Sequence, residues 1–432
     1  MPKLHATSVT PRPGEAVARS PKQAFLIIFF LSFAIRSALL LSGMTPRQFI
    51  FPETATETGA VAKTLFETGA YADPYIVPTG PTAHPQPLYT GMITLIYHLF
   101  GVTLTAGYVR CFLCIACFSA MYAMIPWFAS KIGADWQGGA LGGLVGALIP
   151  QQSLGELIGW SVNEPLAAIA LALLLAGFLQ RWREPGHSFL SALLFGVGWG
   201  VAFHFSPALL LVMLAGLAFE LWWSKSRRKW LSSLLVVLGA TLACLPWTWR
   251  NYAAFHEFFF IRSNLGLELR VGNHPGAAAA MEVMDAREGD RMRHPGNNRA
   301  EAVKVRELGE REYMRQAQSE AWDWISAHPA EFLRLTAARV MHFWFGPLHQ
   351  PLVAAGISLL TILAVLGAGR ALPAWSPPQR AALLIPLATF PLVYYVVAYM
   401  SRYAVPVNWL LLMLAGNEVW NWIKRGGASN NS

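Results

Sequence analysis

Residues 44–101 read MTPRQFIFPETATETGAVAKTLFETGAYADPYIVPTGPTAHPQPLYTGMITLIYHLFG and follow a long apolar run. Near the start of this stretch, Glu53 and Glu57 are four residues apart, so on a helix both carboxylates share one face. Apolar side chains at helical spacing follow, and the pattern ends near Gly69. The proline-rich turns after it contain His84. The stretch predicts a folded loop on a membrane with acid–base groups at its start; the alternative is a surface helix with solvated glutamates.

Apolar residues dominate the whole chain. Of its 432 residues, 54% are hydrophobic, only 13% are charged and 17 are tryptophan. A soluble protein of this size carries about 25% charged residues. Apolar runs of about 20 residues recur, and this is the length that a helix needs to cross a bilayer. We therefore expect an all-α integral membrane protein with about ten transmembrane helices and amphipathic helices in its outer loops.

The basic residues indicate how the chain is oriented in the membrane. The formal net charge is +9. Nucleic-acid binding is one explanation, but much of the charge lies in short loops between the apolar runs. That distribution is typical of membrane topology and of attraction to anionic lipid. We expect membrane lipid as a partner, and no nucleic acid.

The apolar runs define the predicted spans. Residues 1–22 are polar and basic, with no small-residue cleavage site after the first run, so we expect a retained first span and not a signal peptide. The predicted spans are 23–43, 106–130, 137–152, 165–181, 188–204, 207–223, 230–248, 351–368, 380–399 and 404–422. With the N-terminus inside, every short basic cluster falls on one side of the membrane, as the positive-inside rule requires.

This topology divides the chain into segments. They are a cytoplasmic tail, 1–22; a transmembrane catalytic module, 23–248, with the first outer loop at 44–105; an extracytoplasmic subdomain, 249–348; C-terminal transmembrane helices, 349–423; and a second cytoplasmic tail, 424–432. The subdomain is long enough to fold outside the membrane but too short and polar for a large core of its own. We expect a multi-pass protein of the inner (plasma) membrane.

Acidic and basic side chains recur on the predicted outer side. Glu164 precedes Pro165 at the entrance of a span, where a carboxylate also suits the helix dipole, so helix capping is the alternative to a catalytic role. The outer cations are Arg110, Arg250, Arg262, His274 and Arg402. Arginine suits phosphate because its planar group makes paired hydrogen bonds. For Arg110 and Arg402, an interfacial anchor is the alternative.

Carboxylates and arginines at an outer membrane interface suit the transfer of a sugar from a lipid phosphate. The phosphate of such a donor lies at the level of the headgroups, and its sugar lies in water. A carboxylate can take the proton of an attacking hydroxyl while arginines stabilise the departing phosphate. Nearby negative charge also favours an oxocarbenium-like transition state at the sugar carbon.

Several short motifs occur in a particular order along the chain. They are ETGAVAKTLFET (57–68), GAYADPY (69–75), GPTAHPQPLY (80–89), LIYHLFG (95–101), VNEP (162–165), PWTWRNY (246–252), RSNLGLELRVGNHPGA (262–277) and SRYAVPV (401–407). In these motifs and in its hydropathy layout, the chain resembles the GT-C superfamily of polytopic glycosyltransferases. The similar branch contains the protein O-mannosyltransferases and the lipid A aminoarabinose transferases, and is glycosyltransferase family 39-like.

The resemblance implies a GT-C fold with an acidic residue of the first outer loop as catalytic base and a second acidic residue before the fourth span. These positions correspond to Glu57 or Glu53, and to Glu164. The family often has an adjacent Asp-Glu pair, so the separation of Glu53 and Glu57 leaves the choice open; Glu57 has the better spacing to the GAY and GPTAH segments. We assign substrate binding to His84, Arg110, Arg250, Arg262, His274, Arg402 and Tyr403.

The sequence requires no cofactor. Some members of the superfamily bind a divalent metal near the carboxylates, and a metal here is compatible with the resemblance. Cys111, Cys114 and Cys117 have metal-like spacing but no histidine or acidic partner nearby, so packing on one helix face explains them better. The family often has a basic residue before a proline in a mid-chain outer loop, whereas this sequence has Ser206 before Pro207.

We expect a membrane glycosyltransferase, a hexosyl- or pentosyltransferase, that moves a sugar from a polyprenyl-phosphate donor to a glycan, lipid or protein acceptor on the outer side. The alternative is a transporter or flippase of lipid-linked sugars, which would have polar groups along its spans and a midplane site. The ionisable groups cluster at one interface, and no internal repeat relates the two halves. A non-catalytic scaffold would leave the outer carboxylates without a role.

Overall fold

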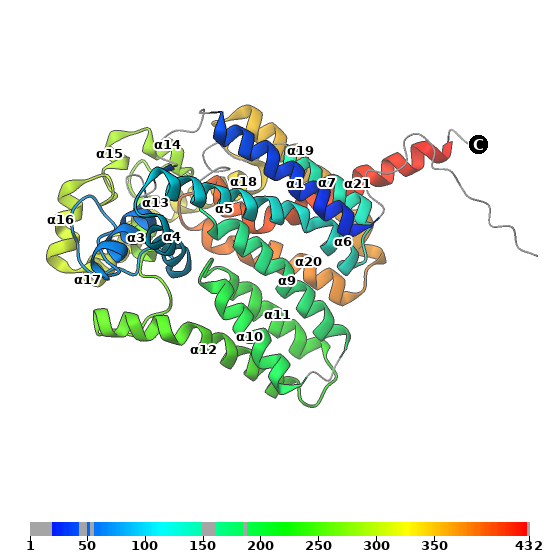
Figure 1. Ribbon diagram of the computed structural model, residues 1–432, viewed down its shortest axis with the longest axis horizontal. Coiled ribbons are helices and arrows are strands. Elements are labelled where there is room, and N and C mark those ends of the chain that lie inside the picture. Colours follow the sequence, from blue (N-terminus) through cyan, green and yellow to red (C-terminus); the bar gives the residue numbers. More distant parts are fainter. Residues whose placement is uncertain (1–19, 43–49, 52–55, 149–160, 185–187, 430–432) are drawn as a thin grey trace, which may run out of the picture.

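Helices form all the regular structure in the described part of the chain (Figure 1). The computed structural model describes residues 20–42, 50–51, 56–148, 161–184 and 188–429. Within these ranges there are isolated β-bridges between Ala72 and Pro81 and between Ala280 and Tyr399, but no strand. The predicted all-α class is confirmed.

Apolar helices build a bundle. They are α1 (Pro21–Leu41), α5 (Leu104–Ala123), α6 (Ile125–Ile132), α7 (Trp136–Leu148), α9 (Asn163–Arg183), α10 (Phe189–Phe203), α11 (Leu209–Trp223), α12 (Lys229–Phe255), α19 (Pro351–Ala374), α20 (Pro377–Thr389) and α21 (Val405–Ser429). Five stretches are long and apolar enough to cross a membrane: α1, α5 continued by α6, α9, α12 and α19. The described helices thus support a membrane protein without establishing the predicted count of ten spans.

Small residues let the helices of the bundle pack closely. On α7, Gly142 lies so near α21 that an added Cβ would collide with the carbonyl oxygen of Leu412. On α10, a Cβ at Gly196 would collide in the same way with the carbonyl oxygen of Val236 on α12. Close backbone approach through small residues is typical of helix interfaces in membranes.

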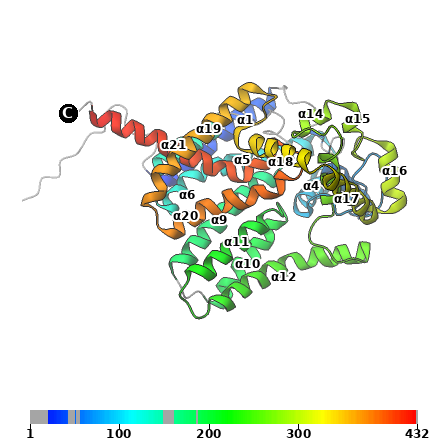
Figure 2. The ribbon, with the colours of Figure 1, turned by 180° about the vertical axis from the view of Figure 1, so that it is seen from behind.

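Another group of helices forms a helical cap at one end of the bundle. Its members are α3 (Glu57–Thr68), α4 (Pro87–Phe100), α13 (Leu265–Gly272), α14 (Met281–Asp285), α15 (Glu288–Arg291), α16 (Arg299–Leu308), α17 (Glu310–Ala327) and α18 (Pro329–Phe345). Both ribbon views place this cap at the end of the molecule opposite to the C-terminal end of α21 (Figures 1 and 2). The cap has a buried cluster of its own, which includes Tyr75, Leu267, Met284, Tyr313 and Leu335.

Helix α3 confirms the amphipathic helix predicted in the first outer loop. The hydroxyl of Thr56 caps its N-terminus by accepting the N–H of Gly59 at 3.0 Å. Gly69 ends it with a left-handed φ of 75°, a conformation that glycine adopts without steric cost. Gly69 was the sequence signal for the end of the helix. The start differs from the prediction that Glu53 and Glu57 share one helix face, because the extended N-cap Thr56 makes α3 begin only at Glu57, and Glu53 lies outside the described residues.

Several observed helices differ from the predicted segments. The predicted span 106–130 is divided into α5 and α6, α19 continues to Ala374, and α21 continues to Ser429. Helix α12 continues to Phe255, so the chain leaves the bundle later than expected. The predicted span 380–399 is α-helical only to Thr389 and continues as the 3₁₀ helix η2 (Phe390–Tyr395). Pro391 explains this change, because it has no N–H to donate to the preceding turn. The first outer loop also contains α4, a second helix that was not predicted.

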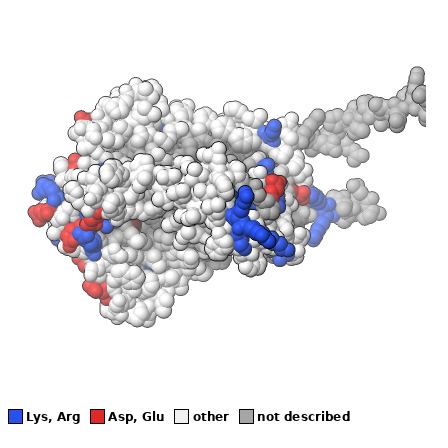
Figure 3. All heavy atoms as spheres, turned by 90° about the horizontal axis from the view of Figure 1, so that it is seen from below, with Lys and Arg blue, Asp and Glu red and all other residues white. Residues whose placement is uncertain are grey.

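Charged side chains gather at the two ends of the molecule on the face shown in Figure 3, and the belt between them is almost free of charge. The end formed by the helical cap carries both signs, while the opposite end carries mostly Lys and Arg. A charge-poor belt is what the hydrocarbon of a bilayer requires, because an ionised side chain there is costly.

Candidate active site

A cavity of about 630 Å³ lies where the helical cap meets the ends of the membrane helices. Both assigned carboxylates that the structure describes line it, together with four assigned binding residues: Glu57, Glu164, His84, Arg262, Arg402 and Tyr403. Glu53 lies outside the described residues. The fold therefore brings acidic and basic groups from distant parts of the sequence to one space.

Glu57 begins α3 and faces this cavity. The first turn of a helix favours a carboxylate, because its unpaired N–H groups make that end positive. Oε1 of Glu57 lies 3.9 Å from Nε2 of His294, and the Glu57 side chain is 35% exposed. A partly open carboxylate beside a cavity can take a proton from a bound molecule.

Glu164 and Arg402 approach each other at the same cavity. Oε1 of Glu164, in the first turn of α9, lies 4.0 Å from Nε of Arg402. Arg402 belongs to the 3₁₀ helix η3 (Ser401–Ala404), and its guanidinium lies 5.7 Å over the ring of Tyr403. Tyr403 in turn stacks on Tyr394 with ring centres 4.5 Å apart. This long ion pair and the contact with Tyr403 hold the guanidinium of Arg402 at the cavity.

The turn that carries His84 is held by several hydrogen bonds. Nε of Arg262 donates to the carbonyl oxygen of His84 at 2.7 Å, and Glu310 accepts the N–H of Ala83 at 2.8 Å. The hydroxyl of Tyr75 lies 3.1 Å from Nδ1 of His84. Burial lowers the pKa of His84 well below its ordinary value, and the charge of Arg262 acts in the same direction. The imidazole is therefore neutral at neutral pH, with Nε2 left for a ligand.

Glu310 and Arg250 support this turn from behind. Glu310 is buried at the start of α17 and also accepts hydrogen bonds from the hydroxyls of Thr82 and Ser263. Burial raises the pKa of this carboxyl, and the two hydroxyls act in the opposite direction. Arg250 donates to the carbonyl oxygens of Thr82 and Tyr71, each at 2.7 Å. Arg250, assigned to substrate binding from the sequence, is thus placed as a support of the loop and does not line the cavity.

Arg110 and His274, also assigned to substrate binding, lie behind the cavity wall. Arg110 is buried on α5, and its Nη1 donates to the hydroxyl of Tyr89 at 3.1 Å. His274 is buried as well, with Nε2 3.7 Å from Oδ1 of Asp290. Tyr89 and Asp290 do line the cavity. Arg110 and His274 therefore do not line the cavity themselves, but each contacts a residue that does.

Glu57, His84 and His294 form a group with the composition of a metal site. One ligand atom from each lies within 4.8 Å of the other two. Two histidines and one carboxylate are a ligand set of catalytic zinc. Nδ1 of His294 accepts the N–H of Gly296 at 3.0 Å, so without a metal the ring carries its proton on Nε2, toward Glu57. Metal binding at Nε2 requires that hydrogen bond to break and the proton to move to Nδ1.

His294 was not among the residues found from the sequence. The tripeptide HPG occurs twice, at 274–276 and at 294–296, and the resemblance covers the first copy. The structure places the second copy at the cavity and the first behind Asp290. The repeated tripeptide was the available signal, but it gives no information on which copy approaches the first outer loop.

The comparisons with known proteins bear on the fold. No protein-family model and no curated protein matches the sequence. The structure matches the apo form of the oligosaccharyltransferase of Archaeoglobus fulgidus with a TM-score of 0.56 and 15% identity, over 95% of this chain and 52% of that one. The same enzyme, AglB, in complex with an inhibitory peptide and a dolichol-phosphate gives a TM-score of 0.54 and 15% identity, over 95% and 51%. The chain has the fold of this archaeal oligosaccharyltransferase.

The predicted resemblance to the GT-C superfamily is thus confirmed at the level of the fold. This chain spans about half the length of the archaeal enzyme that it matches. ArnT from Cupriavidus metallidurans also matches, with 13% identity over 93% of this chain and 78% of that one, but its TM-score of 0.34 is too low to support an argument. In this GT-C fold, the cavity with Glu57 and Arg402 is the candidate active site.

Proposed function

We propose that this chain is a membrane glycosyltransferase that takes a sugar from a polyprenyl-phosphate donor and transfers it to a hydroxyl group of an acceptor. One observation carries the proposal: a single cavity is lined by Glu57 and Glu164 together with Arg262 and Arg402. The archaeal enzyme with the same fold was solved with a dolichol-phosphate, which is a lipid of this class.

Two arginines supply the phosphate contacts. Arg262 uses Nε to hold the turn of His84, and its Nη atoms make no hydrogen bond to the described residues. Arg402 brings a second guanidinium from η3. Planar guanidinium groups match the oxygens of a phosphodiester, and their charge stabilises the phosphate as it leaves. Apolar residues of the same cavity, among them Phe205, Leu210 and Val393, suit the first isoprene units of the lipid.

Glu57 is the proposed general base. The acceptor oxygen bonds to the anomeric carbon and gives its proton to Glu57, while the bond from that carbon to the phosphate oxygen breaks and its electron pair leaves on the phosphate. Oε1 of Glu57 lies on the side of His294, so Oε2 is the oxygen for the proton. Glu164 keeps Arg402 in place, and both carboxylates favour the positive charge that develops on the sugar.

A divalent metal is part of the proposal. The archaeal neighbour was also solved in complex with Zn and sulfate, with a TM-score of 0.53. In this chain Glu57, His84 and His294 would hold the ion. When bound, the ion supplies positive charge that lowers the pKa of a hydroxyl group beside it.

The transporter alternative has less support. A transporter needs polar groups along its spans. Arg36 is a charge buried within α1, but its guanidinium donates to the carbonyl oxygens of Ala147 at 2.8 Å and Gly146 at 3.1 Å, in the last turn of α7. Arg36 thus caps a helix end, and the carboxylates and arginines that line the 630 Å³ cavity lie at the junction with the cap.

The test is sugar transfer in proteoliposomes with a panel of polyprenyl-phosphate sugars. Glu57→Gln keeps the shape of the side chain and removes its basicity, so turnover should fall about 10²–10⁴-fold. Glu67→Gln is the matched control, because Glu67 lies on the same helix, is exposed and pairs with Lys63. We expect Glu53→Gln to cost much less than Glu57→Gln.

Two results would count against this proposal in different ways. Equal turnover of wild type and Glu57→Gln would remove the role of Glu57, and a reversed order of Glu53→Gln and Glu57→Gln would make Glu53 the base. A folded wild-type protein that transfers no sugar from any donor of the panel would contradict the proposed function itself.

A further inference from the structure

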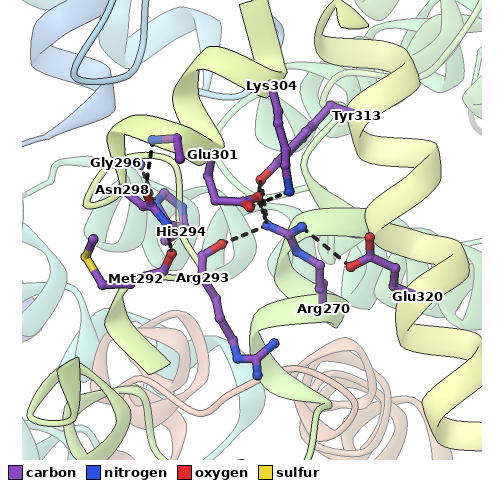
Figure 4. A network of polar contacts seen from close by, with 11 residues as sticks. Arg270, Met292, Arg293, His294, Gly296, Asn298, Glu301, Lys304, Tyr313 and Glu320 are labelled. Atoms are coloured by element: carbon purple, nitrogen blue, oxygen red, sulfur yellow. Dashed lines mark hydrogen bonds and ion pairs between the residues drawn. The ribbon is translucent and has the colours of Figure 1, made fainter. Parts of the chain in front are cut away.

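Arg270 connects several segments of the helical cap (Figure 4). It lies on α13, and its side chain is 10% exposed. Its Nη2 donates to the carboxylate of Glu301 and to the carbonyl oxygen of Arg293, both at 2.8 Å, and to the hydroxyl of Tyr313. Its Nη1 lies 3.5 Å from the carboxylate of Glu320. One guanidinium therefore ties α13 to α16, to α17 and to the turn that follows α15.

The bond to Arg293 reaches the turn at residues 292–298, which carries His294. Within this turn, the side chain of Asn298 donates to the carbonyl oxygen of Met292 at 2.7 Å, and the N–H of Asn298 donates to the carbonyl oxygen of His294 at 3.1 Å. The turn is closed by its own hydrogen bonds. The bond from Arg270 attaches it to the core of the cap at the residue directly before His294.

Arg270 is suited to hold this turn and not to bind a substrate. It does not line the cavity, and its charge is compensated by the partly buried Glu301 at 2.8 Å, whereas Glu320 is exposed and only approaches it to 3.5 Å. A buried polar group that loses its hydrogen bond costs free energy. Arrangements of the cap that break the contacts of Arg270 are therefore disfavoured, and the turn keeps one position. Any shift of the turn changes the 3.9 Å distance between His294 and Glu57.

We propose that Arg270 is a positioning residue: through the carbonyl oxygen of Arg293, it fixes the place of His294 beside Glu57 and His84. This inference rests on the proposed function, because the task of His294 there is to hold a divalent metal. A guanidinium is needed because Arg270 donates hydrogen bonds to acceptors on several different segments at the same time. An ammonium has the same charge but is a point donor without the planar fork.

The experiment compares the full chain in detergent micelles as wild type, Arg270→Lys and Glu320→Gln. Without metal, hydrogen–deuterium exchange over residues 291–298 should be about tenfold faster in Arg270→Lys, since the turn opens locally. By calorimetry, the Zn²⁺ affinity of this variant should fall about 10–100-fold, the usual effect of losing a partner outside the ligands. Glu320→Gln should match the wild type in both measurements, because Glu320 is 61% exposed and its contact is long.

Tyr313→Phe gives a second, milder variant. It removes one acceptor that holds Arg270 and keeps the buried ring, so we expect a folded protein with a smaller change in the same direction. Unchanged exchange at 291–298, or unchanged Zn²⁺ affinity, in folded Arg270→Lys and Tyr313→Phe would overturn the inference. A wild type that binds no Zn²⁺ would instead disprove the metal part of the proposed function, and Arg270 would then have no ligand to position.

Discussion

Arg402 lies at the cavity with its guanidinium over the ring of Tyr403 and near Glu164. If it holds the leaving phosphate, Arg402→Lys keeps the charge but loses paired hydrogen bonds, which are worth about 1.5–3 kcal/mol with a charged partner. We expect kcat/KM for sugar transfer to fall about 10–100-fold. Arg334→Lys, on the exposed face of α18, is the control. Equal activity of the two variants would mean that Arg402 is an interfacial anchor.

At the scale of single residues, the sequence predicted the type of group at the site better than its position. Glu57, Glu164 and Arg402, which line one cavity, could be singled out because they stand in short motifs at the outer ends of apolar runs. Arg250 had the same appearance in the sequence, yet it grips carbonyl oxygens of the first outer loop. Arg250 and Arg402 both stand in short motifs, and their different positions depend on which groups of the folded chain each guanidinium contacts. That information belongs to the tertiary fold and not to the motif.

At the scale of elements, local sequence signals could predict only those features of a helix that neighbouring residues determine. Gly69 ends α3 locally, so this limit could be predicted, whereas the start at Glu57, directly after the N-cap Thr56, was not predicted. The change from α20 to η2 depends on where Pro391 stands in the turn, and a hydropathy run does not show it. The arrangement of the cap could not be predicted either, because it depends on buried polar contacts such as those of Arg270 and Glu310 between distant segments.

Glu301 of α16 gives the cap a dependence on pH. Burial opposes its ionisation, but hydrogen bonds from Tyr313, Arg270 and Lys304 lower the pKa of Glu301 from 4.5 to about 2. Because the folded pKa is the lower one, this stability is fully present above about pH 4.5 and is lost as the pH falls toward 2. In detergent, we expect Tm of the wild type to exceed that of Glu301→Gln at neutral pH and the two curves to converge in acid. Glu312→Gln, which changes an exposed residue, should follow the wild type; parallel curves for wild type and Glu301→Gln would contradict the assignment.

At the scale of the whole molecule, the two ends differ in the charges that they carry. The cap end carries both signs and the cavity, and the opposite end carries mostly Lys and Arg (Figure 3). A lipid-linked donor needs both environments, because its chain lies in hydrocarbon and its phosphate and sugar lie at the surface. A cavity at the junction of bundle and cap meets that need without a polar path through the membrane.

The orientation of the molecule can be tested with single cysteines. The basic link between α11 and α12, with Lys225, Arg227 and Arg228, predicts that its end of the bundle is cytoplasmic, so that Asn297 on the cap faces the outside. In a background without the four native cysteines, Asn297→Cys should react with an impermeant maleimide in intact cells. Lys225→Cys should react only after the cells are opened. The reverse pattern would place the cavity in the cytoplasm, where a donor on the outer leaflet could not reach Glu57, and would contradict transfer on the extracytoplasmic side.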